Sequence, residues 1–285
     1  MYSNKKEENI KIFEDTIRMI NGSEKLLLAV ENSIQNTVIY QPDSRSAERA
    51  DRRHMTVTVT NERSLEAAAR LSEKHEGKRI AVLNFASATN AGGGVTKGSS
   101  AQEEALCRCS TLYPCLNTDC LKEKFYQVNR ARHSALYSDA CIYTPDIFMI
   151  KSDTSSPKRL PEDKWISIDI ITCAAPNLRA QPSNHMNPNA GDPVKLSDSE
   201  LLELHIKRGR NIMNTAALNN ADVLVLGAFG CGAFRNDPKI VSWAYKKLCT
   251  EFGGYFDEIC FAVYCPPDDQ RNFNTFKATL SGMRT

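Results

Sequence analysis

From residue 54 to the C-terminus, short apolar segments alternate with longer amphipathic ones, and this alternation restricts the fold more than any other feature of the sequence. The short segments are rich in isoleucine, valine and leucine, which is typical of buried β-strands. We expect strands at 54–61, 79–85, 140–144, 146–151, 165–173, 223–226 and 259–264. Apolar strands separated by helices form a parallel or mixed sheet with helices on both faces.

The segments between these strands repeat apolar residues every three or four positions, which predicts helices. Ser64 is the expected N-cap of the first helix. Further helices are expected from about Ala101, and over 197–218, 240–248 and 268–280. Two polar segments that contain proline, 41–53 and 182–193, are predicted to be exposed loops.

Residues 1–50 are expected to form a helical extension, because Ile10, Phe13 and Ile17 recur at helical spacing. The predicted organisation is an N-terminal helical extension at 1–50, packed on an α/β domain at 51–285. The composition, 41% hydrophobic and 25% charged over 285 residues, is ordinary for a globular protein. A chain of this length buries a sizeable core without disulfide bonds.

Two glycine-rich loops follow two of the expected strands. The first comes after the strand that ends at Phe85 and contains three adjacent glycines at 92–94; the second, at 227–238, contains Gly-Cys-Gly and leads into a helix. Glycine reaches positive φ and lets a ligand approach the main chain, so successive N–H groups can hold an anion. A strand, a glycine loop and a helix N-terminus together form a diphosphate site. The alternative for the first loop is an ordinary flexible turn.

The two common phosphate-binding motifs do not fit these loops. Arg235 stands where a dinucleotide fingerprint has its third glycine, and no Walker sequence surrounds Lys97. The net charge is only +2, from 36 basic and 34 acidic residues. A nucleotide diphosphate would therefore be held by local backbone geometry rather than by a broad positive surface.

The ten cysteines are not spaced like zinc ligands, so we expect no metal and predict small buried thiols. The N-terminus has no apolar signal core, and no apolar run is long enough for a membrane helix. These features predict a cytoplasmic protein with reduced thiols and no membrane partner.

Gln102-Glu103-Glu104 opens the helix that follows the first glycine loop. Acidic residues are common in a first helical turn because they complement the helix dipole, and this plain explanation stays open. Successive helical residues point about 100° apart, so the two glutamates face different parts of a ligand. Adjacent residues cannot flank a glycosidic bond as an opposed pair. In glycosidic chemistry one glutamate would act as the acid, and that residue or the substrate would activate water.

The glycine loop and the paired glutamates together resemble the signature of the poly(ADP-ribose) glycohydrolases. The matching residues are Asn90, Gly92, Gly93, Gly94 and, after a seven-residue gap, Gln102, Glu103 and Glu104. The flanking segments 83–86 and 110–116 resemble the microbial type, and 227–234 resembles that family's phosphate loop. The resemblance spans residues 4–276, and Ala91 departs from the proline that is usual in the family.

This resemblance implies a macrodomain-like α/β fold, a three-layer α/β/α sandwich with a mixed central sheet. It implies hydrolysis of the ribose–ribose O-glycosidic bond of poly(ADP-ribose) from chain ends, with ADP-ribose as the product and without metal or cofactor. Glu104 would be the general acid and base, Glu103 would orient ribose hydroxyls, and Asn90 would bind the distal ribose. Phe234 would stack on adenine. The diphosphate would be bound by the amides of Gly93, Gly94, Val95, Gly230, Cys231, Gly232 and Ala233, and the predicted substrate-binding set also includes Gly92 and Gln102.

Two other functions stay open. A non-catalytic ADP-ribose-binding module would use the same loops, but it has no use for Glu104. A mono-ADP-ribosyl hydrolase would recognise the same diphosphate, adenine and distal ribose, which makes ADP-ribosylated protein a second substrate class. No direct DNA binding and no catalytic histidine are expected. Tyr113, Tyr137 and Trp243 are expected in the core, and Asn177 is expected to line the pocket.

Overall fold

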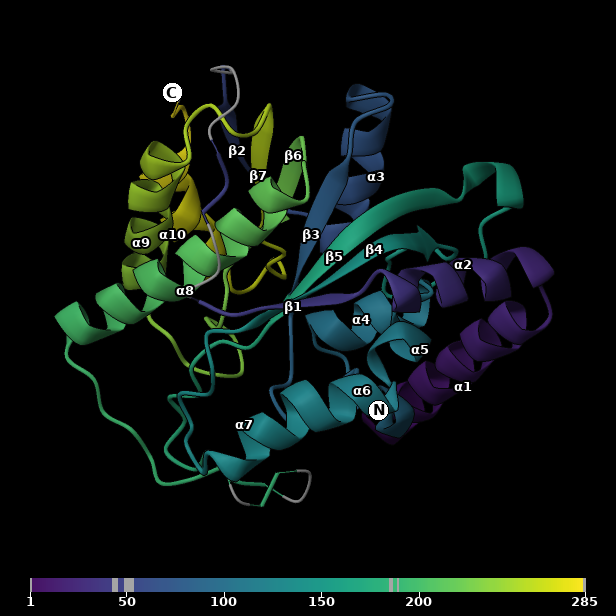
Figure 1. Cartoon of the computed structure of the whole chain (residues 1–285). Helices are drawn as coiled ribbons and strands as arrows, with labels where there is room; N and C mark the ends of the chain where they lie inside the picture. Colours follow the sequence, from purple (N-terminus) through teal and green to yellow (C-terminus); the bar gives the residue numbers. More distant parts are fainter. Residues whose placement is uncertain (1, 43–45, 49–53, 185–186, 189, 284–285) are drawn as a thin grey trace.

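The computed structural model describes residues 2–42, 46–48, 54–184, 187–188 and 190–283. Within them the strands form a mixed seven-stranded sheet in the order β1-β4-β5-β3-β6-β7-β2 (Figure 1). The strands are β1 (Val38–Tyr40), β2 (Thr56–Thr60), β3 (Ile80–Phe85), β4 (Cys141–Met149), β5 (Ile166–Cys173), β6 (Val223–Leu226) and β7 (Glu258–Ala262). Neighbouring strands from β5 to β2 are parallel, whereas β4 is antiparallel to both β1 and β5. The mixed sheet predicted from the sequence is confirmed.

Helices cover both faces of this sheet. α8, α9 and α10 lie on one face, and α1 to α5 lie on the other (Figure 1). The helices are α1 (Tyr2–Asn21), α2 (Glu24–Gln35), α3 (Ser64–Lys74), α4 (Gln102–Cys109), α5 (Leu112–Leu116), α6 (Asp119–Leu121), α7 (Val128–Ala131), α8 (Asp198–Leu218), α9 (Pro238–Glu251) and α10 (Arg271–Leu280). A short 3-10 turn, η1 (Val95–Lys97), precedes α4, and a π-helical stretch, η2 (Lys122–Gln127), joins α6 to α7. The predicted three-layer α/β/α sandwich is therefore the observed architecture.

Strand β3 shows how two separate cores arise from one sheet. Successive residues of a strand point to opposite faces. Ile80 and Val82 join the apolar cluster beneath α1 to α6, whereas Ala81 and Leu83 join the cluster beneath α8 to α10. All four side chains are buried. A strand that is covered on both faces needs apolar residues at every position, which explains its continuous apolar sequence.

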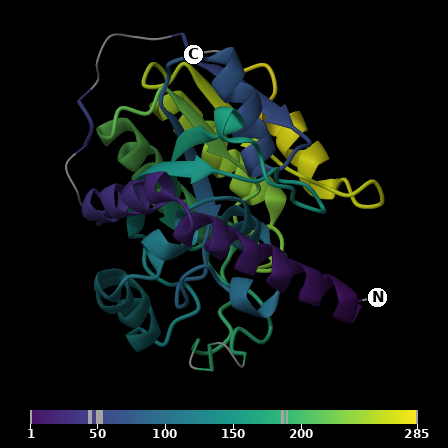
Figure 2. The ribbon, with the colours of Figure 1, turned by 90° about the vertical axis from the view of Figure 1, so that its right-hand side faces the viewer.

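The N-terminal helices pack on the same layer as α4. α1 crosses this face of the molecule (Figure 2). Its Asp15 pairs with the buried ammonium of Lys151 at 3.0 Å, and Thr16 Oγ1 donates to the main-chain oxygen of Arg108 in α4. The segment is not only helical, because β1 adds a strand to the edge of the sheet. The predicted domain boundary between residues 50 and 51 lies outside the described residues.

The two strands expected at 140–144 and 146–151 are one strand, so this prediction is wrong. β4 continues through the region with a shift of register between Thr144 and Ile147. Asp146 has a φ of 55° at the shift, next to a proline that has no N–H for the ladder. A bulge lets the strand continue past the proline.

Two side chains lie elsewhere than the sequence predicts. Ser64 is the first residue of α3 and not its N-cap; Arg63 takes that position, and its N–H donates to the Glu66 carboxylate at 2.9 Å. Trp243 is 53% exposed on the outer face of α9, with the ammonium of Lys246 4.8 Å from its ring centre. The indole is therefore not part of the core.

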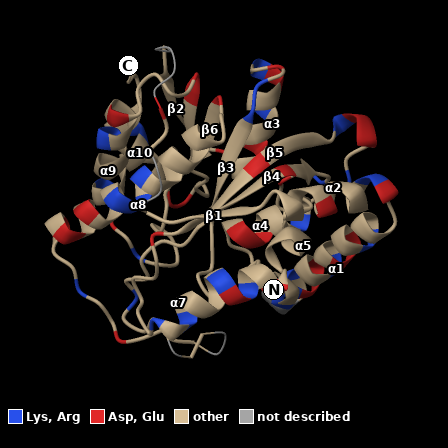
Figure 3. Ribbon diagram, viewed as in Figure 1, with Lys and Arg blue, Asp and Glu red and all other residues tan. Residues whose placement is uncertain are grey.

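Acidic and basic residues are interspersed along the outer helices (Figure 3), in keeping with the small net charge. None of the helices in the described residues is both long and apolar enough to span a bilayer. The loops expected at 41–53 and 182–193 lie partly outside the described residues.

Candidate active site

The carboxyl ends of β3, β5, β6 and β7 meet at a cavity of about 610 Å³. The loops that follow these strands form its wall, together with the first turns of α3 and α4. Both glycine-rich loops line it, as expected for a ligand site at the carboxyl ends of parallel strands. The volume is within the usual range for small-molecule sites.

The first glycine loop lies directly against the two glutamates. Gly92 and Gly93 have φ values of 66° and 58°, which residues with a side chain rarely adopt. A Cβ on Gly93 would lie 2.5 Å from Glu104 Oε1 and 2.9 Å from Glu103 Oε2. A Cβ on Gly92 would lie 2.7 Å from the ring of Tyr113. Gly92 and Gly93 therefore let the main chain pass between an aromatic ring and two carboxyl groups.

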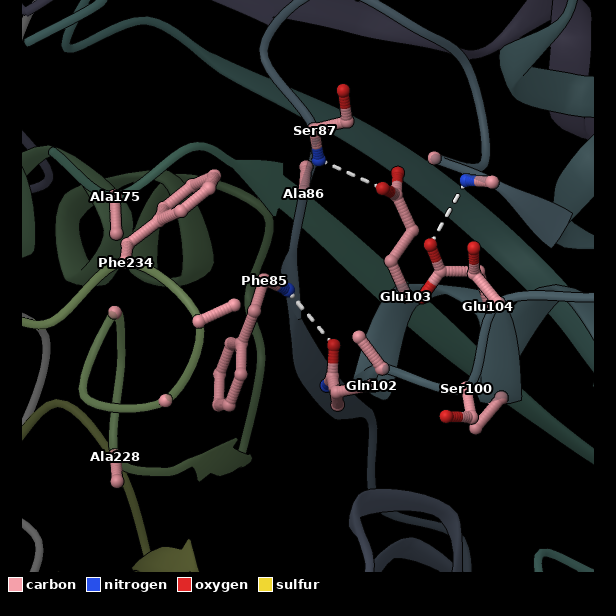
Figure 4. A pocket seen from close by; sticks show the side chains of 18 of the residues that line it. Phe85, Ala86, Ser87, Ser100, Gln102, Glu103, Glu104, Ala175, Ala228 and Phe234 are labelled. Carbon is pink, nitrogen blue, oxygen red and sulfur yellow. Dashed lines mark hydrogen bonds between the residues drawn. The ribbon is translucent and has the colours of Figure 1, made fainter. Parts of the chain in front are cut away.

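Glu104 lies on the cavity wall with only 7% of its surface exposed. Its Oε1 accepts a hydrogen bond from the main-chain N–H of Gly94 at 2.9 Å (Figure 4). Its Oε2 is buried and has no hydrogen-bond partner among the described residues. One oxygen is thus fixed by the loop, and the other is left for a ligand.

Glu103 is oriented by the other side of the same loop. Its Oε2 accepts from the N–H of Ser87 at 2.7 Å (Figure 4). Its Oε1 accepts from Asn84 Nδ2 at 3.4 Å. Burial raises the pKa of the Glu103 carboxyl well above its usual range; the Ser87 amide opposes this rise, and the neighbouring Glu104 adds to it. The two glutamates thus accept hydrogen bonds from different amides of the loop, while the prediction that they face different parts of a ligand stays a prediction.

Gln102 joins α4 to β3. Its Oε1 accepts from the N–H of Phe85 at 2.9 Å, and its Nε2 donates to Leu83 O at 2.8 Å and to Ser64 Oγ at 3.0 Å. The side-chain amide lines the cavity, but its hydrogen bonds are used by the protein. Gln102 therefore positions the first turn of α4, which carries both glutamates.

The first loop does not offer the anion site that the sequence suggests. The amides of Gly93, Gly94 and Val95 donate to Asn90 O, Glu104 Oε1 and Gly92 O, at 3.0, 2.9 and 3.1 Å. They are not available to a diphosphate, contrary to expectation. Gly92 and Val95 are buried and do not line the cavity, whereas Gly93 and Gly94 do.

The second loop is different, because several of its amides have no acceptor. The N–H groups of Gly230, Gly232, Ala233 and Phe234 find none among the described residues, and all four residues line the cavity. Cys231 is buried behind them, and its N–H donates to Ala228 O at 3.1 Å. Burial raises the pKa of the Cys231 thiol, which therefore stays protonated. The diphosphate prediction thus fits this loop better than the first, with Cys231 excepted.

A buried side-chain pair holds the second loop in shape. Asn236 Nδ2 donates to the main-chain oxygens of Pro176 and Gly230 at 2.8 and 3.1 Å, so its Oδ1 is left to accept from His205 Nε2 at 2.8 Å. Burial lowers the pKa of His205 to about 4, so the imidazole is neutral near pH 7. A Cβ on Gly230 would lie 2.6 Å from Asn236 Nδ2, which explains the glycine there. The histidine therefore supports the shape of the loop.

The end of the cavity near β5 is lined by aromatic and amide side chains. The ring centres of Phe234 and Tyr137 are 6.2 Å apart, and Asn177 lies close by, with its Nδ2 3.4 Å from Tyr137 Oη. The predicted position of Asn177 is confirmed, whereas Tyr137 lines the cavity instead of lying in the core alone. Asn90 lines the same end, and its Oδ1 accepts from Arg130 Nη2 at 2.9 Å.

Three further lining residues were not found from the sequence. Arg63 and Tyr264 follow β2 and β7 at the opposite end of the cavity, with the guanidinium carbon 4.3 Å from the ring centre. Arg63 comes shortly after the strand expected at 54–61, and Tyr264 is the last residue of the strand expected at 259–264; these places at strand ends are the signal in the sequence. Asp153 gave no such signal; it is buried, and its Oδ1 has no partner among the described residues.

No group of three or more histidine, cysteine or acidic side chains that could hold a metal occurs in the part of the chain that the structure describes. All ten cysteines are free thiols, and Cys120 is exposed while the other nine are buried. The prediction of small buried thiols therefore holds for nine of the ten.

A family model for the catalytic domain of microbial-type PARG, the poly(ADP-ribose) glycohydrolases, matches residues 6–152. Among solved structures, poly(ADP-ribose) glycohydrolase from Thermomonospora curvata is 28% identical, with a TM-score of 0.82 over 96% of this chain and 99% of that one. The same enzyme bound to the inhibitor ADP-HPD gives a TM-score of 0.79 at 28% identity, over 95% and 99% of the two chains. No curated protein matches the sequence.

Poly(ADP-ribose) glycohydrolase from Deinococcus radiodurans in complex with ADP-ribose is 34% identical, with a TM-score of 0.72 over 88% of this chain and 96% of that one. The family match covers more than half of the sequence and contains the first glycine loop and both glutamates. The structural similarity covers 96% of this chain. The chain therefore belongs to the microbial-type poly(ADP-ribose) glycohydrolase family.

Proposed function

We propose that the protein hydrolyses the ribose–ribose O-glycosidic bond of poly(ADP-ribose) and releases ADP-ribose from chain ends, with Glu104 as general acid and base. One observation carries this proposal: Glu104 Oε2 is buried on the cavity wall without a partner among the described residues, while Oε1 is fixed by the Gly94 amide. Unpartnered buried carboxyl oxygens are costly, and they are found where a ligand or substrate completes the site.

The geometry decides which oxygen carries the proton. Oε1 accepts an N–H and cannot donate in that direction, so the proton of the acid form belongs on Oε2, the buried oxygen without a partner among the described residues. Glu104 donates this proton to the bridging oxygen as the bond to the anomeric carbon breaks, which leaves an oxocarbenium-like ribose. The carboxylate then takes a proton from water as the water oxygen bonds to the anomeric carbon. The residue ends in the acid form, ready for the next turnover.

Glu103 supports this one-residue chemistry. Both carboxyl groups approach the same point beside Gly93, so they lie on one side of the substrate and not on opposite faces of a sugar. Glu103 has N–H donors from the loop, and we propose that its position beside the anomeric centre also orients ribose hydroxyls.

Substrate binding follows from the loops. We infer that the diphosphate lies on the free amides of Gly230, Gly232, Ala233 and Phe234, with the distal ribose at Asn90 and adenine on an aromatic side chain, for which Phe234 is our candidate. A cavity of about 610 Å³ suits one unit of the polymer, which supports cleavage at chain ends. The two relatives with ADP-ribose and ADP-HPD bound support the same ligand class. Ten free thiols suit a reducing cytoplasm.

The test is the Glu104→Gln protein with poly(ADP-ribose) as substrate. The amide keeps an oxygen for the Gly94 N–H but cannot supply the acid proton, so we expect kcat to fall by about 10²–10⁴-fold while ADP-ribose still binds. Glu251→Gln, a remote and exposed change in α9, is the matched control and should keep the native rate. Native release of ADP-ribose by Glu104→Gln would refute the assignment.

The position of cleavage is tested by separating the products by length. Cleavage at chain ends gives free ADP-ribose from the first turnovers, without short oligomers, and early oligomers would contradict it. Mono-ADP-ribosylated protein is the second substrate to offer. Faster release from it than from polymer would favour a mono-ADP-ribosyl hydrolase, and binding without any turnover would favour a binding module.

A further inference from the structure

We propose that Arg108 is a positioning residue for Glu104, an inference that rests on the proposed function above. Arg108 lies four residues after Glu104 in α4, which places the two side chains on the same face of the helix, one turn apart. It is only 5% exposed. Buried arginines are rare unless something pairs with them, so its role needs an explanation.

The guanidinium completes a closed ring of contacts around the glycine loop. Arg108 Nη1 donates to the main-chain oxygen of Ser99, and the Ser99 N–H donates to Gly94 O at 3.1 Å. The Gly94 N–H donates to Glu104 Oε1 at 2.9 Å, and one turn of α4 returns to Arg108. The ring fixes the distance between the glutamate and the amide that holds it.

Helix α1 supports this ring from outside. Thr16 Oγ1 donates to the main-chain oxygen of Arg108, and Asn9 Nδ2 donates to the main-chain oxygen of Gly98 at 3.0 Å. A Cβ on Gly98 would lie 2.3 Å from Lys6 O, so the loop and α1 are in direct contact. The N-terminal helix therefore supports the arginine and the loop that the arginine holds.

The electrostatic surroundings of Arg108 suit a role beyond packing. Among the described residues its guanidinium has one hydrogen-bond partner, the main-chain oxygen of Ser99, and its Nε is buried without a partner. Burial lowers the pKa of Arg108, while the charges of Glu104 and Asp153 oppose this decrease. The chain thus buries a cation on the same face of α4 as Glu104, one turn further along the helix.

The test separates turnover from binding in Arg108→Gln and Arg108→Lys. Because Arg108 touches none of the amides of the second loop, we expect Arg108→Gln to lower kcat by about 10–100-fold while the Kd for ADP-ribose changes by less than about twofold. Arg108→Lys keeps the charge but loses the planar guanidinium with its several N–H donors, so its kcat should lie between that of the native protein and that of Arg108→Gln. If Arg108→Gln does not fold, Arg108→Lys alone decides, with a reduced kcat at native Kd as the expected result.

Leu248→Ala is the control for lost stability, since Leu248 is buried between α8 and α9, away from the cavity. At an equally lowered Tm it should keep the native kcat. Native kcat in both Arg108 variants would overturn the proposal. A decrease in kcat that Leu248→Ala also shows at the same Tm would overturn it as well, and so would a decrease in kcat accompanied by an equal weakening of ADP-ribose binding. In the Glu104→Gln background, Arg108→Gln should cause no further loss. If Glu104→Gln is itself fully active, the proposed function fails, and this outcome is distinct from native activity of the Arg108 variants alone.

Discussion

Replacing Gly93 with alanine tests the link between the glycine loop and the carboxyl groups. The new Cβ would lie 2.5 Å from Glu104 Oε1 and 2.9 Å from Glu103 Oε2, where ordinary contacts begin at 3.4 Å. The Glu104 carboxylate would therefore have to move by roughly 1 Å, away from the Gly94 N–H that holds it. The φ of 58° adds a backbone cost of about 1–2 kcal/mol for a residue with a Cβ.

These displacements give an expected size for both effects. A shift of about 1 Å in a catalytic group costs on the order of 10²-fold in rate. The backbone cost and the loss of the Gly94–Glu104 hydrogen bond, about 1–3 kcal/mol for a charged acceptor, lower the free energy of unfolding by roughly 2–5 kcal/mol together. The free amides of the second loop are untouched, so ADP-ribose binding should stay close to native.

The assay measures kcat for ADP-ribose release from polymer, the Kd for ADP-ribose and the urea unfolding midpoint. Gly77→Ala is the matched control: its φ is 73°, but a Cβ there meets nothing within 4 Å. It should show the backbone cost of about 1 kcal/mol with native kcat. Native kcat in a folded Gly93→Ala protein would refute the reasoning, because the carboxylate could not then depend on this contact.

Three other changes test separate parts of the site. Phe234→Ala should weaken ADP-ribose binding by about 1–3 kcal/mol in calorimetry if Phe234 stacks on adenine, and a loss confined to Tyr264→Ala would move the base to the Arg63 end of the cavity. Burial lowers the pKa of His205 from 6.5 to about 4, so the free energy of unfolding should decrease by roughly 3 kcal/mol as pH falls from 6.5 towards 4. Urea unfolding of His205→Gln should not show this decrease. Asp153 has its pKa raised from 3.8 to about 6, so stability decreases as pH rises between these values, again by roughly 3 kcal/mol, and Asp153→Asn should flatten that part of the profile. A profile identical to that of the native protein would contradict the assignment in either case.

The strands were predicted closely because their environment leaves a strong trace in the sequence. β3 and β6 are covered on both faces, and their continuous apolar runs give almost the observed bounds. β1 was missed, since three residues at an edge of the sheet, one of them exposed, carry no period. β4 was split because the proline within it marks a strand end in most sequences, whereas here a bulge at Asp146 lets the strand continue.

The sequence predicted some of the residues that line the cavity and missed others. Because ligands bind at the carboxyl ends of strands, Glu104 and Phe234 were expected at one cavity, and both line it. The same rule also covers Arg63 and Tyr264, which follow β2 and β7 and were overlooked. Tyr137 could not be found in this way, because its place depends on a backbone φ of 58° in an irregular segment.

The sequence also suggested that both glycine loops bind the diphosphate, and electrostatics explains why only the second is suited to it. An amide N–H can serve one strong acceptor at a time, and the Gly94 N–H already serves the Glu104 carboxylate. A diphosphate placed beside Glu103 and Glu104 would also meet two groups of its own sign in a buried site, where repulsion is weakly screened. The Gly230–Phe234 loop has free amides and no carboxyl group bonded to them. The glycines therefore expose the main-chain amides in both loops. In the first loop a carboxyl group of the protein occupies the Gly94 amide, whereas in the second loop the amides are left for a ligand.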